Sequence, residues 1–477
     1  MKRTDYDLCI IGGGAAGLVT AAGAASLGAK VILIEKYRLG GDCLYTGCVP
    51  SKTLIHSADV ANTIKTAHKS GLSAELNPIN QSLVMNRVAD VIKTIEPNDS
   101  PERFRAMGVE VIFAEAHFIA EDCLLVEERE ITARKFVLAT GSRPFVPPIS
   151  GLDSVDYFTN ETIFNITENI PHLIVVGSGA IGCEMAQTFA RLGSKVTLLS
   201  NTGLLPMEDV DMSKVVEKQF LTDGIDLHLG IMISHVEKTT IGVRVQLKDD
   251  HRELTSEIEG SHLLIATGRR SNVENLGLDR AGVKVNNGRL EVDARLRTSN
   301  KKIFACGDVA GPYLFTHMAE HQAGIVLRNT LFHLPAKAQV TGIPWCTFTA
   351  PELARVGLSE RDAQESGVKH QVYTFPFSEN DRAITEGQVD GMAKIITTQK
   401  GKLLGACIVG PHAGELIAEY VLAISQGLNV SALSNTIHIY PTLAHINRRV
   451  ADQRMKESLT PSRQRWIKRL FGLRGTQ

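Results

Sequence analysis

Two cysteines separated by four residues are the side chains of this sequence best suited to chemistry. Cys43 and Cys48 lie within residues 40–52, GGDCLYTGCVPSK. This spacing allows a disulfide on the opening turns of a helix, whose dipole, together with any nearby cation, would favour the reactive thiolate. A metal site would need two further ligands at suitable spacing, and the sequence offers none nearby. A pair of ordinary buried cysteines is the remaining alternative, so the spacing favours a redox-active dithiol.

The segment before the dithiol has the glycine spacing of a dinucleotide-binding turn. A short buried strand at 6–11 runs into GGGAAG, an alanine-rich helix ends near Gly28, and a second strand at 30–35 ends in an acid. A merely flexible turn would account for neither the two strands nor the acid. In this context the glycines permit a tight turn, approach of a pyrophosphate and close helix packing, while the acid binds a ribose. The residues given these roles are Gly12, Gly14, Gly17 and Glu35.

The same design recurs at residues 172–199. A strand at 172–176 runs into GSGAIG, a helix follows to about Leu192, and another strand covers 195–199. We therefore expect a second dinucleotide site on Gly177, Gly179 and Gly182. Its second strand ends in Ser200 and Asn201, with neither an acid nor an arginine that could bind a 2′-phosphate. The absence of the acid removes a repulsion against the 2′-phosphate of NADP. This slightly favours NADPH but excludes neither nucleotide.

The composition is that of an ordinary globular protein without a strong overall charge. Of 477 residues, 43% are hydrophobic and 22% are charged, and the formal net charge is -1, so no nucleic-acid partner is expected. Eight scattered cysteines are too few for a secreted disulfide framework, which indicates a reducing, cytoplasmic compartment. Glycines interrupt the apolar N-terminal stretch, and no uninterrupted run reaches the ~20 apolar residues that span a bilayer. No metal site is expected.

At these positions the sequence resembles the class I pyridine nucleotide–disulfide oxidoreductases, the family of dihydrolipoyl dehydrogenase, glutathione reductase and mercuric reductase. The cysteine motif matches throughout 40–52, and the resemblance covers about residues 5–453. It includes ATGSRP from Ala139, ATGR from Ala266, and IFACGD at 303–308, which is similar to the family's second flavin motif. The resemblance implies a homodimeric enzyme that uses FAD and NAD(P)H and passes electrons to a small-molecule acceptor.

The resemblance also implies roles for individual side chains. Asp308 would bond the flavin ribityl chain, and Lys52 would sit near the flavin N5 and pair with Glu184 in the nicotinamide-site helix. Electrons from NAD(P)H would pass through the flavin and open a Cys43–Cys48 disulfide. Cys48 would be the flavin-proximal thiolate, and Cys43 would exchange with the acceptor. Further cofactor contacts are expected at Gly41, Thr140, Gly141 and Gly268.

The C-terminal part departs from the pattern of the disulfide-reducing relatives. In those relatives a His-Pro-Thr motif supplies a base histidine to the partner subunit's active site, and a glutamate five residues later orients it. Here residues 438–445 are HIYPTLAH, so Tyr440 occupies the position of the base and His445 that of the carboxylate. A tyrosine ionises far above neutral pH and is a poor base. His438 and His445 are candidate replacement bases, with packing or surface roles as the alternative.

Mercuric reductases also carry tyrosine at this point, which favours a mercuric reductase-like enzyme. Those enzymes deliver their substrate with a vicinal cysteine pair at the extreme C-terminus, whereas the last cysteine here is Cys407. Capture of a soft metal ion would then depend on Cys43 and Cys48 alone. The acceptor is left as a disulfide, a metal ion or a similar group. Dihydrolipoyl dehydrogenase and a non-catalytic flavoprotein redox sensor are the alternative functions.

These assignments predict an α/β protein with two Rossmann-type three-layer nucleotide-binding domains and a C-terminal α+β dimerisation domain. The FAD-binding domain would take residues 1–150 and 271–338, the NAD(P)-binding domain 151–270, and the dimerisation domain 339–455. The tail, 456–477, is basic and has apolar residues at helical spacing. We interpret it as a solvated or dimer-packed helix, with a peripheral membrane-surface helix as the alternative.

Overall fold

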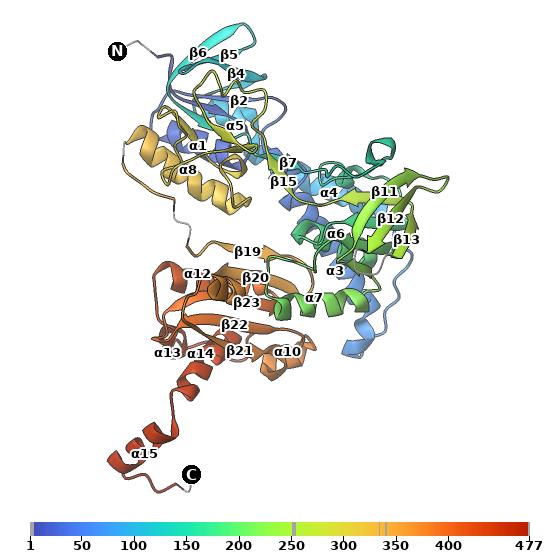
Figure 1. Cartoon of the computed structure of the whole chain (residues 1–477), viewed down its shortest axis with the longest axis vertical. Helices are drawn as coiled ribbons and strands as arrows, with labels where there is room; N and C mark the ends of the chain where they lie inside the picture. The colour runs from blue at the N-terminus through green and yellow to red at the C-terminus, as the bar shows by residue number, and fades with distance from the viewer. Residues whose placement is uncertain (1–3, 250–253, 333, 339–340, 476–477) are drawn as a thin grey trace. The chain divides into compact units, whose positions relative to one another are not determined.

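The computed structural model describes residues 4–249, 254–332, 334–338 and 341–475. It contains two compact units. Residues 1–61, 77–201 and 228–340 form the first, and residues 62–76, 202–227 and 341–477 form the second. Helices and strands alternate through most of the chain (Figure 1), which confirms the predicted α/β class. The exact domain boundaries derived from the sequence stay a prediction.

The first unit is built on a sheet whose central strands are buried on both faces. Its strand order is β3-β2-β1-β6-β5-β4, with β18 paired to β6. The β1, β2, β3 and β18 pairings are parallel, whereas β4 and β5 add an antiparallel extension. Leu8 and Ile10 face one core while Cys9 and Ile11 face the other, so β1 needs a continuous apolar run. The bounds are β1 (Tyr6–Ile11), β2 (Val31–Glu35), β3 (Val109–Phe113), β4 (Ala116–Ala120), β5 (Cys123–Val126), β6 (Arg129–Leu138) and β18 (Ile303–Ala305).

Two helices far apart in sequence cover one face of this sheet. α1 (Ala15–Ser26) and α8 (Thr316–Leu331) pack side by side on it (Figure 1). The small residues of α1 allow this, since a Cβ at Gly23 would lie 2.5 Å from a methyl group of Leu327. Further helices of this unit are α4 (Gln81–Ile95) and α5 (Pro101–Ala106).

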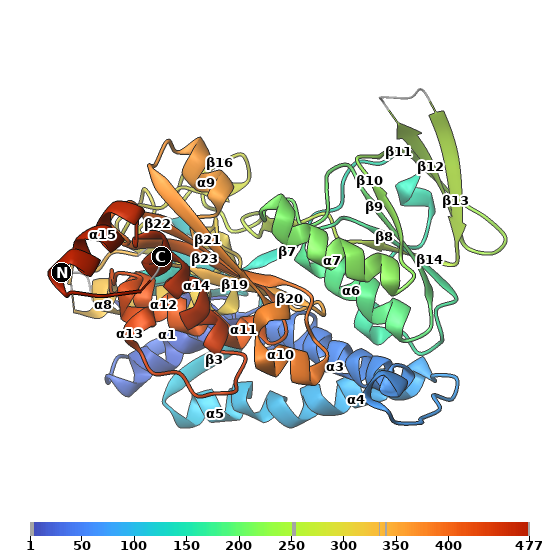
Figure 2. The ribbon, with the colours of Figure 1, turned by 90° about the horizontal axis from the view of Figure 1, so that it is seen from below.

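A second nucleotide-binding sheet has the strand order β10-β9-β8-β14, and β8 pairs in parallel with both β9 and β14. Helix α6 (Ala180–Arg191) connects β8 to β9, as the repeated strand–turn–helix–strand pattern predicts. A three-stranded antiparallel sheet, β11-β12-β13, accompanies it (Figure 2). The bounds are β8 (His172–Val176), β9 (Lys195–Ser200), β10 (Asp226–Leu229), β11 (Met232–Lys238), β12 (Val243–Asp249), β13 (Leu254–Gly260), β14 (His262–Ile265) and the short β16 (Val285–Asn286) and β17 (Arg289–Leu290).

The second unit is an antiparallel sheet packed against helices, the α+β arrangement predicted for the C-terminal part. Its strand order is β19-β20-β23-β22-β21. The buried rings of Phe375, Phe377 and Tyr420 lie in the core between the sheet and the helices. The strands are β19 (Pro344–Thr347), β20 (Glu352–Gly357), β21 (His370–Pro376), β22 (Met392–Thr398) and β23 (Leu403–Gly410). The helices are α9 (Glu360–Glu365), α10 (Asp381–Glu386), α11 (Ala413–Leu416), α12 (Ala418–Ser425), α13 (Ser431–Asn435) and α14 (His445–Glu457).

Buried ion pairs attach α7 (Val210–Thr222) to this second sheet. The Lys394 side chain is only 2% exposed, and its Nζ lies 2.5 Å from an Asp211 oxygen, 3.1 Å from Glu360 and 3.4 Å from Asp209. A buried ammonium needs such partners, because an uncompensated charge in the interior is costly. The pairs therefore fix the position of α7 on the C-terminal sheet.

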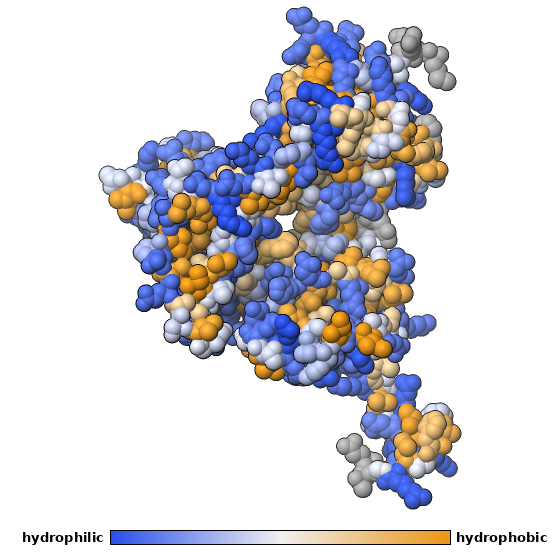
Figure 3. Space-filling view, turned by 180° about the vertical axis from the view of Figure 1, so that it is seen from behind, coloured by the Kyte–Doolittle hydropathy of each residue, from blue (hydrophilic) through white to orange (hydrophobic). Residues whose placement is uncertain are grey.

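The last helix, α15 (Pro461–Leu470), follows α14 and has no buried residue. Figure 3 shows apolar side chains exposed on this C-terminal segment. Within the described residues, no helix combines the length and apolarity required to cross a membrane.

Candidate active site

The two cysteines lie on successive helices rather than on one. Cys43 belongs to α2 (Gly41–Tyr45), and Cys48 is the first residue of α3 (Cys48–Lys65). The chain turns between them at Gly47, where a Cβ would lie only 2.9 Å from the Asp42 carbonyl oxygen. The spacing of the cysteines predicts a single helix, and the break at Gly47 divides it into two. As the first residue of α3, Cys48 lies where the helix dipole favours an anion.

The surroundings of the two sulfurs make Cys48 the thiolate and Cys43 the thiol. Both are unbridged, and Cys48 is the more exposed. A hydrogen bond from Cys43, another from Thr316 and the charge of Lys52 lower the pKa of Cys48 to about 6, against the opposing effect of burial. The same hydrogen bond with Cys48, and burial, raise the pKa of Cys43. The Cys48 Sγ lies 3.6 Å from the Thr316 Oγ1 at the start of α8.

An ion pair connects the dithiol helix to the second nucleotide unit. The Lys52 Nζ donates to the Glu184 Oε2 at 2.8 Å, and the Glu184 side chain is 5% exposed. Lys52 is on α3, one turn after Cys48, and Glu184 is on α6, which follows the second glycine motif. The structure thus brings together the lysine and the glutamate that the sequence analysis singled out.

The first glycine motif forms a surface that only glycines allow. A Cβ at Gly12, where φ is 110°, would lie 2.3 Å from the Ala139 carbonyl oxygen, and one at Gly17 would lie 1.9 Å from the Gly12 oxygen. Gly14 and Gly41 face one another closely, since a Cβ on Gly41 would lie 2.7 Å from the Gly14 Cα. Bare backbone at the start of α1 is what the approach of a pyrophosphate requires.

Glu35 is held at the carboxyl end of β2, beside this surface. Its Oε2 accepts a hydrogen bond from the Gly13 N–H at 2.7 Å, and its Oε1 accepts one from the Tyr37 N–H at 2.9 Å. Asp308 follows β18, and burial raises the pKa of its carboxyl group. The Asp308 Oδ2 accepts a hydrogen bond from the Ser142 Oγ at 2.5 Å. A glycine surface, the Glu35 carboxylate and the half-buried Asp308 together fit an adenine dinucleotide such as FAD.

The second glycine motif repeats the backbone contacts of the first. A Cβ at Gly177 would lie 2.3 Å from the Ala266 oxygen, and one at Gly182 would lie 1.9 Å from the Gly177 oxygen. The difference is at the end of the second strand. Ser200 takes the place of the acid, and its hydroxyl lies 2.7 Å from the Ser178 hydroxyl. The sequence analysis noticed Ser200 but not its pairing with Ser178.

The two Ala-Thr-Gly segments each lead into a short strand, and these two strands pair with one another. Thr140 and Gly141 follow β6, Gly268 follows β14, and β7 (Ser142–Pro144) then pairs with β15 (Arg269–Ser271). The Thr140 Oγ1 donates to the Asn272 carbonyl oxygen at 2.7 Å, and the Thr267 Oγ1 donates to the Phe145 carbonyl oxygen at 2.7 Å. These bonds fix β7 and β15 in place, so the Ala-Thr-Gly segments have a structural role in addition to any contact with a cofactor.

Arg269 joins this pair of strands to the dithiol turn, and the sequence analysis missed that link. Its Nη2 lies 3.0 Å from the Asp42 Oδ2, and its Nε donates to the Ser142 Oγ at 2.7 Å. The Asn160 amide donates to the Asp42 Oδ1 at 3.1 Å and to the Thr46 oxygen at 3.0 Å. The arginine inside a repeated Ala-Thr-Gly segment was the available signal for Arg269. No sequence signal pointed to Thr316 or Asn160.

The three C-terminal candidates lie in the second unit. The Tyr440 side chain is 66% exposed, and the hydrogen bond that its hydroxyl donates to Asp381 at 2.9 Å raises the pKa of Tyr440. The His438 Nε2 lies 3.0 Å from the Glu419 Oε1. His445 stands at the start of α14 with its ring edge toward Tyr440, and burial, followed by the charges of nearby arginines, lowers its pKa.

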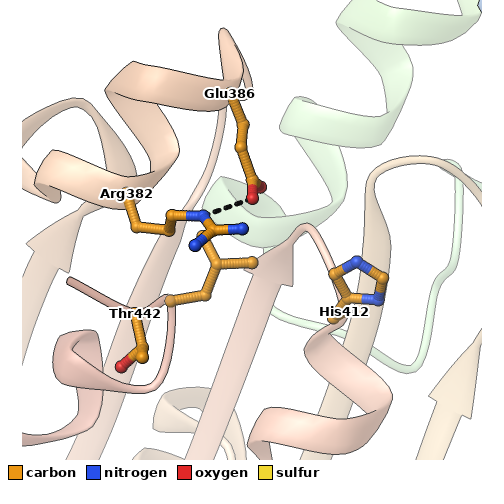
Figure 4. A pocket seen from close by; sticks show the side chains of 5 residues that line it. Arg382, Glu386, His412 and Thr442 are labelled. Atoms are coloured by element: carbon orange, nitrogen blue, oxygen red, sulfur yellow. Dashed lines mark hydrogen bonds and ion pairs between the residues drawn. The ribbon is translucent and has the colours of Figure 1, made fainter. Parts of the chain in front are cut away.

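A hollow of about 270 Å³ lies beside this C-terminal stretch (Figure 4). Arg382 and Glu386 form an ion pair on one side of it, and His412 and Thr442 line it from other segments. None of the predicted site residues lines the hollow.

Comparison with known proteins agrees with this geometry. Residues 6–323 match the family described as pyridine nucleotide-disulphide oxidoreductase, and residues 343–450 match the dimerisation domain of the same family. The chain belongs to this family. It is therefore an FAD- and NAD(P)H-dependent oxidoreductase rather than a flavoprotein without turnover, and its dimerisation domain supports a homodimer.

The most informative relatives divide between two activities. The chain is 34% identical over 450 residues to a mercuric reductase of Streptomyces lividans, covering 93% of this chain and 94% of the relative. It is 35% identical over 459 residues to a dihydrolipoyl dehydrogenase of Thermus scotoductus, covering 92% and 95%. A solved structure, the Cu(II) complex of the HOCl-induced flavoprotein disulfide reductase RclA from Escherichia coli, matches with a TM-score of 0.84 at 29% identity, covering 94% and 100%. The family is thus established, whereas the acceptor is not.

Proposed function

We propose that this enzyme uses the Cys43–Cys48 dithiol to reduce a thiophilic metal ion, in the manner of a mercuric reductase. The observation that carries the proposal is that one chain combines a Cys48 whose pKa is lowered to about 6 with a tyrosine, Tyr440, at the position of the family's base. The net reaction takes two electrons from NAD(P)H. It gives NAD(P)⁺, a proton, and either one Hg(0) from Hg(II) or two Cu(I) from two Cu(II).

The absence of a histidine at the position of the family's base, where Tyr440 stands, favours a metal substrate over a dithiol or disulfide substrate. Exchange with an organic disulfide needs a proton delivered to or removed from the Cys43 sulfur, whose pKa is raised. Tyr440 is a poor group for this, because its hydroxyl donates to Asp381 and its pKa is raised. A soft metal ion binds thiolate directly and itself displaces the thiol proton. The reaction with a metal therefore needs no general base.

The chain's own residues prepare the dithiol for this step. We infer that Lys52 and Thr316 hold Cys48 as the thiolate, while Glu184 fixes the Lys52 ammonium. FAD, when bound, supplies the two-electron link between the nicotinamide and the dithiol. Its proposed contacts are Gly12, Gly14, Gly17, Glu35, Gly41, Thr140, Gly141 and Asp308. The nicotinamide nucleotide is assigned to Gly177, Gly179, Gly182 and Gly268.

Dihydrolipoyl dehydrogenase is the second candidate, and the relative of that name at 35% identity supports it. Here the reaction would run from dihydrolipoamide toward NAD. His438 and His445 would be the available bases. The His438 ring is paired with Glu419, much as a glutamate orients the base histidine of the relatives, but His438 does not occupy the position of that base. Tyr440 therefore argues against this candidate.

An acceptor panel on the purified FAD-loaded enzyme tests the proposal. NADPH and NADH oxidation would be followed with Hg(II), Cu(II), lipoamide and glutathione disulfide, in the wild type and in the Cys43→Ser and Cys48→Ser variants. We expect metal-dependent oxidation that both substitutions abolish, and little turnover of lipoamide. The matched control is Cys123→Ser, at a half-buried cysteine on β5, which should leave the rate unchanged. Faster turnover of lipoamide than of either metal would refute the assignment.

A further inference from the structure

The C-terminal helix α15 presents an apolar surface that nothing in the described part of the chain covers. No residue of α15 is buried, and Trp466, Leu470 and Phe471 are 62%, 58% and 67% exposed. The side-chain hydrogen bonds of Arg463, Gln464 and Arg465 end on residues 458–462, beside the helix itself. Figure 3 shows this segment with apolar side chains gathered on it. Exposed aromatic and aliphatic side chains at such density mark an interaction surface.

The sequence specifies this helix from its own ends, independently of packing. The Thr460 side chain caps the start by accepting a hydrogen bond from the Arg463 N–H at 3.3 Å, and Pro461 occupies the first turn. At the other end Gly472 has a left-handed φ of 62°. A helix with a start signal, a stop signal and no buried residue forms without support from a core, which leaves its apolar side chains available to a partner.

The helix has two faces of different chemistry. At 100° per residue, Trp466, Ile467 and Leu470 fall on one side, with Phe471 at its edge. Arg465, Lys468 and Arg469 fall on the opposite side. Arg463 lies within the apolar side at its first turn, where a long side chain can extend its charged end outward. This is the pattern of a helix that lies in a membrane interface.

The charge of the segment indicates what its partner must be. Residues 458–477 contain five lysines and arginines and no acidic residue, whereas the chain as a whole has a formal net charge of -1. A second copy of the same tail would bring like charge against like charge. An anionic lipid surface offers both a negative field for the cations and an apolar layer for Trp466, Leu470 and Phe471.

We propose that α15 is a peripheral anchor that binds the interface of an anionic membrane, with its apolar face toward the acyl chains. One helix of this length binds weakly and reversibly. A homodimer carries two such helices, so the second binding event is intramolecular and the dimer binds more tightly than either tail. The anchor places the enzyme at a lipid surface.

The test is flotation of the full-length, FAD-loaded enzyme with lipid vesicles. We expect the enzyme to float with vesicles of phosphatidylglycerol in phosphatidylcholine, to stay unbound with phosphatidylcholine alone, and to be released by salt. Arg465→Gln combined with Arg469→Gln should weaken the partition about thirty-fold for each tail. Trp466→Ser combined with Leu470→Ser should abolish it. Leu83→Ser with Ile241→Ser is the matched control, because both side chains are 65% exposed in other elements.

Two further readings distinguish the lipid from other occupants of the surface. On addition of anionic vesicles the tryptophan emission should shift to shorter wavelength, and the shift should be lost in Trp466→Phe. The sedimentation mass in the absence of lipid should be equal in wild type and in the Trp466→Ser, Leu470→Ser variant. Binding that survives both tail variants, or a lower mass in the apolar variant, would overturn the proposal, the latter by assigning the face to a second copy of the chain. NADPH oxidation by the variants is an independent readout, so this result stands or falls separately from the identity of the electron acceptor.

Discussion

Replacing Lys52 by methionine should raise the pKa of Cys48 and weaken the fold locally. The Lys52 charge is one of the causes that lower this pKa to about 6, whereas the Glu184 charge raises it. Lys52→Met removes the first charge and keeps the second, so the pKa of Cys48 should increase by about 1. Cys48 is charged above its pKa, so its thiolate fraction at pH 7 should fall from about nine-tenths to about a half.

The same substitution removes the ion pair between Lys52 and the buried Glu184 carboxylate. Breaking a fully buried pair costs about 3–5 kcal/mol, but the Lys52 side chain is 35% exposed and water screens part of that. We therefore expect a destabilisation of about 2 kcal/mol. Glu184→Gln should act on the thiol in the opposite direction, because it removes the charge that raises the pKa and keeps the lysine.

The assay is the rate at which iodoacetamide alkylates Cys48 in the reduced enzyme, followed by peptide mass spectrometry across a pH series. FAD is removed from the reduced enzyme first, because the flavin that Cys48 is expected to face would shield it from the reagent, whereas the Cys48 side chain is exposed in the chain without ligand. The wild-type rate should fall as the pH drops through about 6, and the midpoint should be higher in Lys52→Met and lower in Glu184→Gln. Lys52→Arg, which keeps the charge, is the control and should resemble the wild type. Midpoints that move in the same direction in Lys52→Met and Glu184→Gln, or that do not move, would refute the electrostatic account.

Three further predictions follow from the site. Tyr440→His should raise dihydrolipoamide turnover by about a hundredfold, the lower limit for a general base, without raising metal-dependent NADPH oxidation. Ser200→Glu should shift the ratio of kcat/KM for NADH over NADPH about tenfold toward NADH, since a carboxylate binds the ribose hydroxyls and repels a 2′-phosphate; an unchanged ratio would contradict the role given to Ser200. Gly41→Ala should lower the flavin retained on purification, because its Cβ would lie 2.7 Å from the Gly14 Cα, whereas Gly108→Ala, with nothing within 4 Å, should retain flavin.

The sequence by itself determined the local units of this protein. The glycines of the two nucleotide motifs act on backbone within a few residues, through positive φ angles and the absence of a Cβ, so their spacing predicts the strand–turn–helix units β1–α1 and β8–α6 directly. The same holds for Cys43 and Cys48, whose separation and glycine neighbours are enough to indicate a dithiol. The continuous apolar run of β1 likewise follows from burial on both faces of a parallel sheet.

Only the tertiary structure decided the electrostatics of the site. The pKa of Cys48 depends first on the hydrogen bond from Cys43, and then on Thr316 of α8 and on the charges of Lys52 and Glu184 from two different helices. Arg269 reaches Asp42 because β7 and β15 pair. Charge–charge and hydrogen-bond energies depend on distances of a few ångströms between groups that lie far apart along the chain, and periodicity or spacing in the sequence does not contain those distances. The resemblance of the sequence therefore indicated both the dithiol and Cys48 as its thiolate, while the contacts that lower the pKa of Cys48 needed the fold.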